Sequence, residues 1–189
     1  KQKLSINADF FSTLFEALPS PTEAENCIDR IKSLGGDYQP YALFVEAEVD
    51  VFNACIELCK STLLQLEASS ERGSYAKEDM VEMKTCLMAS KTPDVWLCSM
   101  PNVSENLSLS QWFIHLKDIK LFHLRWIREI SKEHPLASVV PLNLINKKEF
   151  FFSSIKMMYA YRYKKMASSV KLKLSVETSA IEQTQNSDT

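Results

Sequence analysis

Glycine is scarce in this sequence, and no glycine lies in a phosphate-binding pattern. The 189 residues include only three glycines, Gly35, Gly36 and Gly73. They fit neither the G-x-x-x-x-G-K-S/T loop nor the G-x-G-x-x-G turn, in which glycines let backbone amides approach phosphates. The sequence therefore predicts no nucleotide-binding cradle.

Long hydrophobic runs and paired cysteines are also missing. No apolar stretch approaches the roughly 20 residues that a membrane-spanning helix needs, and residues 1–7 do not resemble a signal peptide. The five cysteines are an odd number without a C-x-x-C pair, which indicates reduced intracellular thiols. The net charge of −2 predicts no general attraction to nucleic acid or anionic membranes.

Helix breakers divide the first 40 residues into two short helices. Residues 9–18 form an amphipathic segment that Pro19-Ser20-Pro21 stops. Thr22 is predicted to cap the next helix, with Glu25 as the returning carboxylate of a capping box. Gly35-Gly36 is expected to end that helix.

A long amphipathic helix is predicted over residues 41–68. Seven residues recur there at gaps of four and three and share one face: Val45, Val49, Phe52, Ile56, Cys59, Leu63 and Leu66. A turn at 69–74 leads to a second helix over 75–90, whose apolar residues are Met80, Met83, Leu87 and Met88. Two helices joined by a short turn predict an antiparallel hairpin.

The second half of the sequence predicts two more helices and a strand. Ser108 and Gln111 form a capping box for a helix that ends before Pro135. Its stripe comprises Leu109, Trp112, Leu116, Ile119, His123, Trp126 and Ile130. Residues 147–166 are aromatic and basic, with a helix expected beyond Phe152, and residues 170–176 alternate as in a strand. The predicted fold is mainly α: a long antiparallel hairpin and a helical bundle, with a short strand near the C-terminus.

Two groups of residues could in principle bind a metal ion, but neither pattern is specific. Cys55 and Cys59 lie one helical turn apart, yet Cys59 belongs to the apolar stripe and free cysteine behaves as a small buried hydrophobe. His115 and His123 lack an H-E-x-x-H motif, and His123 is interpreted as a hydrogen-bonded core residue. The sequence predicts no catalytic, cofactor-binding or metal-binding residue.

Charge is distributed unevenly along the sequence. Residues 16–50 contain eight acidic and two basic residues, whereas residues 147–173 contain eight basic residues and one acidic residue, with Tyr159, Tyr161 and Tyr163 interleaved. The basic stretch could bind an acidic surface or nucleic acid, but a solvated face or an intramolecular partner of the acidic half is the simpler interpretation. Two acidic pairs are interpreted as solvated helix faces: Glu46 with Glu48, and Glu78 with Asp79.

Seven short motifs follow one another along the sequence. They are Asn7-Ala8-Asp9, Leu18-Pro19-Ser20-Pro21, Glu48-Val49-Asp50-Val51-Phe52-Asn53, Pro93-Asp94-Val95-Trp96 with Ser99-Met100-Pro101, the aromatic pair Trp112 and Trp126, Phe150-Phe151-Phe152, and Tyr159-Ala160-Tyr161-Arg162-Tyr163. In this order they resemble the C-terminal part of a dynein heavy chain over about residues 4–178. Val51 stands where that family usually has Arg, and Ser153 where it has Pro, which indicates a divergent member. The resemblance also implies a truncated one, since a dynein would continue beyond Thr189 through the rest of its C-terminal domain.

The resemblance implies a role as well as an architecture. Residues 1–134 would be the small helical (lid) subdomain of the sixth AAA+ module, residues 135–178 the beginning of the dynein C-terminal domain, and residues 179–189 a disordered tail. The segment would be non-catalytic, without cofactor or metal, in a parent motor that moves along microtubules by ATP hydrolysis. The alternative is a stand-alone helical protein-interaction module without motor activity.

The resemblance also implies the partners and the location. The partners would be the neighbouring AAA+ modules and the C-terminal domain of the parent heavy chain. Dynein intermediate and light chains and microtubules would be reached only through the parent, and no nucleic acid or membrane is expected. The setting would be the cytoplasm and the cytoskeleton, with the ciliary axoneme as a specialised case.

Overall fold

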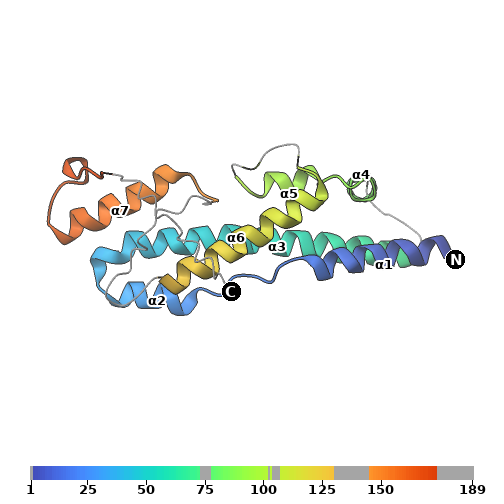
Figure 1. Cartoon of the computed structure of the whole chain (residues 1–189), viewed down its shortest axis with the longest axis horizontal. Helices are drawn as coiled ribbons and strands as arrows, with labels where there is room; N and C mark the ends of the chain where they lie inside the picture. The colour runs from blue at the N-terminus through green and yellow to red at the C-terminus, as the bar shows by residue number, and fades with distance from the viewer. Residues whose placement is uncertain (1, 73–77, 102, 104–106, 130–144, 174–189) are drawn as a thin grey trace, which may run out of the picture.

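The computed structural model describes residues 2–72, 78–101, 103, 107–129 and 145–173, and this part forms an elongated helical molecule (Figure 1). Its α-helices, in order, are α1 (Gln2–Ala17), α2 (Glu25–Ser33), α3 (Gln39–Arg72), α4 (Glu78–Met88), α5 (Asp94–Cys98), α6 (Leu109–Glu129) and α7 (Lys148–Arg162). Two 3-10 turns, η1 (Gly36–Tyr38) and η2 (Ala167–Ser169), complete the regular structure. The prediction of a mainly α fold is confirmed.

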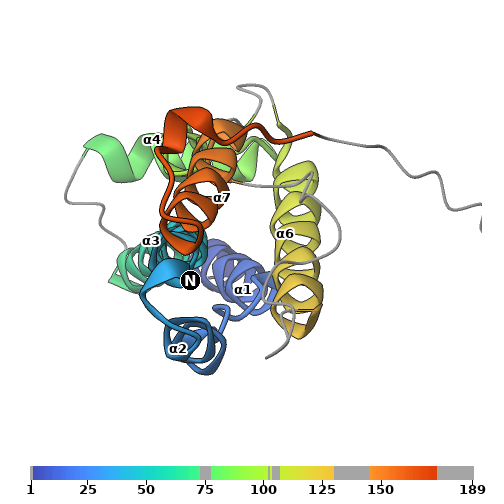
Figure 2. The same ribbon diagram turned by 90° about the vertical axis from the view of Figure 1, so that its left-hand side faces the viewer.

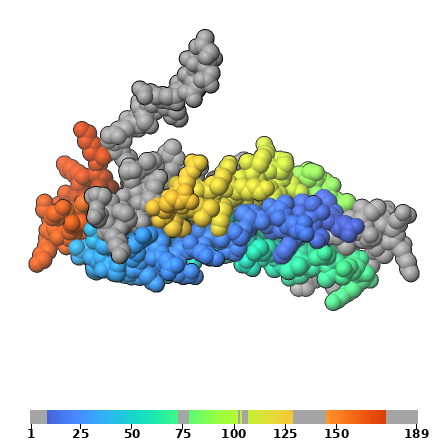
Figure 3. Space-filling model, turned by 60° about the horizontal axis from the view of Figure 1, so that its bottom comes forward, coloured from blue at the N-terminus to red at the C-terminus, as the bar shows by residue number. Residues whose placement is uncertain are grey.

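Helix α3 is the axis of the molecule. Helix α1 packs along one end of α3, and α2 and α7 pack around its other end, while α6 runs across both regions (Figures 1 and 2). The space-filling view shows α1 and α6 next to each other on one face (Figure 3). No helix in the described ranges combines the length and the apolar character that crossing a membrane requires.

The buried apolar side chains form two clusters. The α1 cluster includes Phe11, Phe52, Ile56, Leu63, Trp96, Trp112 and Leu116. The α7 cluster includes Ile31, Tyr41, Phe44, Val49, Trp126, Phe151 and Met158. Helices α3 and α6 contribute to both clusters, so they connect the two apolar regions along the length of the molecule.

The two predicted stripes are confirmed wherever the structure describes them. All seven stripe residues of α3 are buried, as are the six described stripe residues of α6. The capping box of α6 is also present: the Gln111 amide donates to Ser108 Oγ over 3.3 Å, and the Ser108 amide donates to Gln111 Oε1 over 2.9 Å. A regular spacing of apolar residues identifies these helices because burial of one face dominates their stability.

One other expectation is wrong, and a second is not shown. The long antiparallel hairpin is absent, because α4 lies across α3 rather than along it, and α1 is the helix that packs most extensively on α3 (Figures 1 and 2). Among the described residues there is no strand, and 170–173 form an irregular segment in which Leu172 packs against the α7 cluster. An extended segment forms a stable strand only when a neighbouring strand satisfies its backbone. The expected residues 174–176 of the strand and the expected tail lie outside the described residues.

Candidate functional site: a buried polar junction

A group of buried and half-buried polar side chains lies between the two apolar clusters. Glu48 and Asn53 come from α3, His123 comes from α6, and Thr22 lies in the segment that joins α1 to α2. Along α3, Glu48 lies next to Val49 of the α7 cluster and one turn before Phe52 of the α1 cluster. We call Thr22, Glu48, Asn53, His123 and Asn146 the polar junction.

Glu48 is fully buried, and its carboxyl group binds residues 145–146. The Ile145 amide donates to Oε1, the Asn146 amide donates to Oε2 over 3.0 Å, and Asn146 Nδ2 donates to Oε2 over 2.8 Å. Without such donors, a buried carboxyl group would destabilise the fold by roughly several kcal/mol, because it loses its hydrogen bonds to water. The three hydrogen bonds therefore make Glu48 an anchor for the segment that leads into α7.

Asn53 fixes the segment between α1 and α2 to the same side of α3. The Thr22 amide donates to Asn53 Oδ1 over 2.7 Å, and Asn53 Nδ2 donates to the Thr22 carbonyl oxygen over 3.0 Å. This pair of hydrogen bonds satisfies both backbone groups of a residue outside any helix. Next to it, Lys120 Nζ of α6 donates to the Pro21 carbonyl oxygen, and burial lowers the pKa of Lys120 while Glu23 opposes that shift.

His123 lies between Thr22 and Glu48, and of its two ring nitrogens only Nδ1 forms a hydrogen bond within the described part of the chain. Its Nδ1 lies 3.4 Å from Thr22 Oγ1, and its Nε2 lies 4.0 Å from Glu48 Oε1. Its ring packs edge-on against Phe52 with a centroid separation of 5.3 Å and an interplanar angle of 84°. The interpretation of His123 as a hydrogen-bonded core residue is confirmed, since its side chain is fully buried.

The residue types of the junction resemble those of a hydrolytic triad, but their surroundings do not allow that chemistry. A hydroxyl nucleophile must face a site that a substrate can enter. Thr22 is 3% exposed, and Glu48 and His123 are 0% exposed. The role that this burial supports is structural, because the junction is where α3, α6, the 18–24 segment and residues 145–146 meet.

The structure corrects two predictions about these residues. Thr22 does not cap α2, because the helix begins at Glu25 and its N-cap residue, Ala24, makes no side-chain hydrogen bond. Glu48 is not part of a solvated face, although its predicted companion Glu46 is partly exposed and pairs with Lys32 at 3.4 Å. The sequence does contain a signal for the burial of Glu48, because Glu48 lies in a series of α3 residues whose gaps alternate strictly between four and three. All members of this series are buried: Tyr41, Val45, Glu48, Phe52, Cys55, Cys59, Thr62 and Leu66.

The other candidate metal ligands, Cys55, Cys59 and His115, lie outside the polar junction. Cys55 and Cys59 are buried beside each other in the α1 cluster, and the hydrogen bond to Cys55, followed by burial, raises the pKa of the Cys59 thiol. His115 is half-buried near Trp112, and burial lowers its pKa while Asp118 opposes that shift. Over the described ranges, no three or more metal-ligating side chains form a group that could hold an ion.

Neither charged stretch neutralises the other. Lys32 pairs with Glu46 inside the acidic stretch, and Lys60 pairs with Glu57 beyond it, so neither ion pair reaches the basic stretch. Glu78 and Asp79 are exposed, as their interpretation as a solvated face predicts. The acidic half and the basic stretch therefore do not bind each other through ion pairs of described residues.

Comparison with known protein families gives one match over almost the whole length. The family model of the C-terminal domain of the dynein heavy chain matches residues 2–189. Neither curated proteins nor solved structures gave a significant match. The match includes every residue of the polar junction.

Proposed function

The protein belongs to the family of C-terminal domains of dynein heavy chains, and from this membership we propose that it is a non-catalytic framework segment of a dynein-type motor. In this role it supports ATP-driven movement along microtubules through its parent. The division into a lid subdomain of the sixth AAA+ module (residues 1–134) and the beginning of the C-terminal domain (residues 135–178) stays a prediction, because the family match runs without a break over residues 2–189. The boundary between these two parts lies outside the described residues.

The observation that carries this proposal is the continuity of α3 and α6 through both apolar clusters. Helix α3 has 34 residues, which corresponds to roughly 50 Å at 1.5 Å per residue. A helix of this length that is packed at both ends conveys a displacement of one end to the other, because close-packed interfaces shift as rigid bodies rather than deform smoothly. The polar junction supports this role by bringing three other segments together on the first half of α3.

The partners and location follow from the same role. Neighbouring AAA+ modules and the remainder of the C-terminal domain would contact this segment directly. Intermediate chains, light chains and microtubules would be reached only through the parent, in the cytoplasm or in the axoneme of a cilium. We do not expect an ATPase activity of this segment, since its glycines lie in no phosphate-binding pattern.

The test compares nucleotide binding with motor movement. The purified protein should show no ATP turnover and no ATP affinity in the micromolar range. In the parent motor, Glu48→Ala should slow microtubule gliding, whereas Glu46→Ala, two residues away and partly exposed, should leave the velocity unchanged. Measurable ATP binding by the protein, or equal velocities for the two variants, would contradict the proposal.

A second candidate function rests on the outer face of α6. Ile114 is 60% exposed, Leu121 is 54% exposed and Leu124 is 43% exposed, and their spacing places them on one face of the helix. This face suits a partner helix, as in a stand-alone interaction module. Slower microtubule gliding of the parent in Glu48→Ala would favour the framework role, whereas gliding that does not depend on this protein would favour the alternative.

A further inference from the structure

We propose that the C-terminal end of α7 and the segment that follows it form a docking surface for an acidic peptide segment. We call this surface the basic platform and define it by Tyr159, Tyr163, Lys165, Lys171 and Lys173. These residues line a shallow, open pocket of about 350 Å³. The platform lies at the end of α7 and contains no residue of the polar junction, so the proposal goes beyond the framework role.

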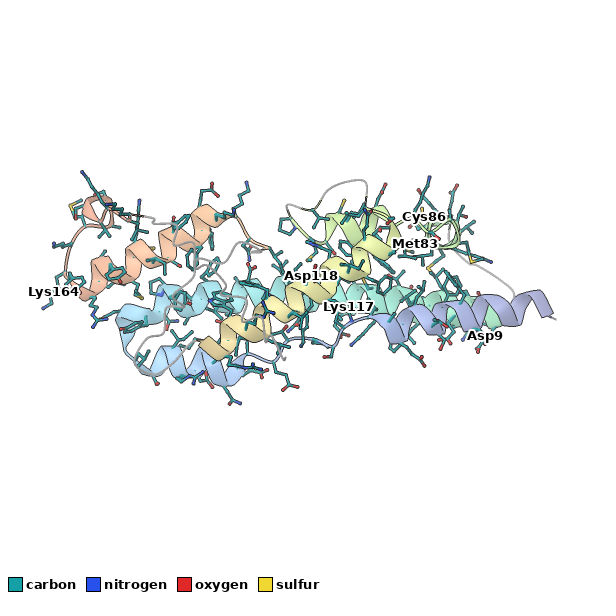
Figure 4. All side chains as sticks on the ribbon, viewed as in Figure 1. Asp9, Met83, Cys86, Lys117, Asp118 and Lys164 are labelled. Atoms are coloured by element: carbon teal, nitrogen blue, oxygen red, sulfur yellow. The ribbon has the colours of Figure 1, made fainter. Side chains whose placement is uncertain are left out.

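The platform is built by a tight turn at the end of α7. The Lys165 amide donates to the Ala160 carbonyl oxygen over 2.9 Å, and the Lys164 amide donates to the Tyr161 carbonyl oxygen over 3.2 Å. These are the two hydrogen bonds of a Schellman motif, with Lys164 in the left-handed region at φ 50°. The turn, visible at Lys164 in Figure 4, reverses the backbone so that η2 and residues 170–173 return beside α7.

Leu172 determines how the lysines on this returning segment are presented. Its side chain packs against the α7 cluster, whereas Lys171 and Lys173 are exposed on either side of it. Successive side chains of an extended segment point to opposite sides. The packing of partly buried Leu172 therefore leaves both lysines on the outside, where they line the same pocket as Tyr159 and Tyr163.

The charge of this region is of one sign. Residues 150–173 contain six basic residues and no acidic residue. Among them Lys164, Lys165, Lys171 and Lys173 are exposed, and none forms an ion pair with a described carboxylate. Several unpaired like charges in a short stretch repel one another, and an anionic partner removes that repulsion.

Exposed aromatic and sulfur-containing side chains accompany these charges. The Tyr159 and Tyr163 rings are stacked with a centroid separation of 6.1 Å and an interplanar angle of 3°. Tyr163 is 59% exposed and Met166 is 76% exposed. Tyrosine and methionine are enriched at protein interfaces, because they offer apolar contact area together with adaptable packing. The partner that fits is thus a peptide with carboxylates and at least one apolar side chain.

The same features disfavour nucleic acid as the occupant. Base stacking needs exposed aromatic rings, but of the platform's two tyrosines only Tyr163 is exposed, and it lies parallel to the partly buried ring of Tyr159. The guanidinium of Arg162, the type of group that binds phosphate in a fork, donates to Tyr38 Oη over 2.6 Å and lies 5.8 Å from the centre of that ring. The anion is therefore left mainly to lysines, and three of them gather around one small open pocket instead of lining an extended groove.

The experiment measures peptide binding by fluorescence anisotropy with the complete protein. The probe is a labelled peptide of the sequence Glu-Glu-Leu-Glu-Glu-Phe-Glu-Glu, and its companion has glutamine in place of every glutamate. Lys171→Gln combined with Lys173→Gln should weaken binding of the acidic probe by about five- to tenfold. The same exchange at Lys147 and Lys148, at the opposite end of α7, should leave it unchanged.

Two further measurements test whether the platform recognises negative charge. Lys171→Arg combined with Lys173→Arg should retain binding, and affinity for the acidic peptide should fall when salt is raised from about 50 mM to about 300 mM. No binding of the acidic peptide, equal binding of the glutamine peptide, or equal losses in the two double variants would overturn the proposal. Tighter binding of a single-stranded octanucleotide would overturn it by assigning the platform to nucleic acid. Concentration-dependent self-association that the peptide competes away would overturn it by assigning the platform to a second copy of this protein.

Discussion

Removal of the Glu48 carboxyl group is the perturbation whose effect follows most directly from the structure. In Glu48→Ala, three N–H donors at Ile145 and Asn146 lose their buried acceptor. Each unsatisfied buried donor costs about 1–3 kcal/mol, but local relaxation and entry of water recover part of the sum. We therefore expect the free energy of unfolding to fall by about 3–5 kcal/mol, the range typical of removing one partner from a buried polar pair.

The assay is urea denaturation followed by tryptophan fluorescence, because Trp96, Trp112 and Trp126 are all buried and report on both clusters. Glu46→Ala is the matched control, since it removes a partly exposed ion pair from the same helix and should cost at most about 0.5 kcal/mol. If Glu48→Ala does not fold, Glu48→Gln keeps the shape and one acceptor oxygen and should lose less. Equal losses for Glu48→Ala and Glu46→Ala would refute the anchoring role of the carboxyl group.

Three other predictions concern packing, backbone strain and pH. Phe52→Ala should lower the free energy of unfolding by about 3–5 kcal/mol, because Phe52 is fully buried. Asp50→Ala should cost little, because Asp50 is exposed on the same helix. Similar urea midpoints for the two variants would show that the buried face of α3 is assigned incorrectly. Ser90, just after α4, has φ 57°, a left-handed conformation that glycine adopts more easily than serine. Ser90→Gly should therefore raise the free energy of unfolding by about 0.5 kcal/mol in the same assay. A Ser90→Gly protein less stable than Ser90→Ala would refute this. Burial lowers the pKa of His115 in the folded state, so the unfolded state binds more protons and stability should fall as the pH drops below about 6.5. His115→Gln should reduce this pH dependence, and an unchanged slope would contradict it.

The long helices could be predicted because a single local pattern determines them. The stripes of α3 and α6 place apolar side chains on one face at gaps of three and four, and burial of that face outweighs other preferences. The capping box at Ser108 is equally local, since both of its hydrogen bonds lie within four residues. The segment from Glu48 to Asn53 stands out as a motif, but the residue types at its ends do not show that distant parts of the molecule bind them.

The features that could not be predicted depend on contacts between distant segments. Thr22 has the sequence context of a helix cap, yet Asn53 of α3 and His123 of α6 bind it instead. Residues 170–173 alternate like a strand, but they follow a helical cluster, against which partly buried Leu172 packs. The choice of α1 rather than α4 as the main partner of α3 is also a tertiary contact. Local periodicity indicates which face is buried, not which element covers it.

Hydrogen exchange measured by mass spectrometry along a urea series is the most direct test that α3 and α6 join the two clusters into one rigid framework. We expect peptides from α1 and from α7 to acquire deuterium with the same free energy of opening, because neither cluster opens without the other. In Glu48→Ala the two free energies should separate. If α2 and α7 of the unaltered protein open at much lower urea than α1, the two clusters are independent and no rigid framework exists.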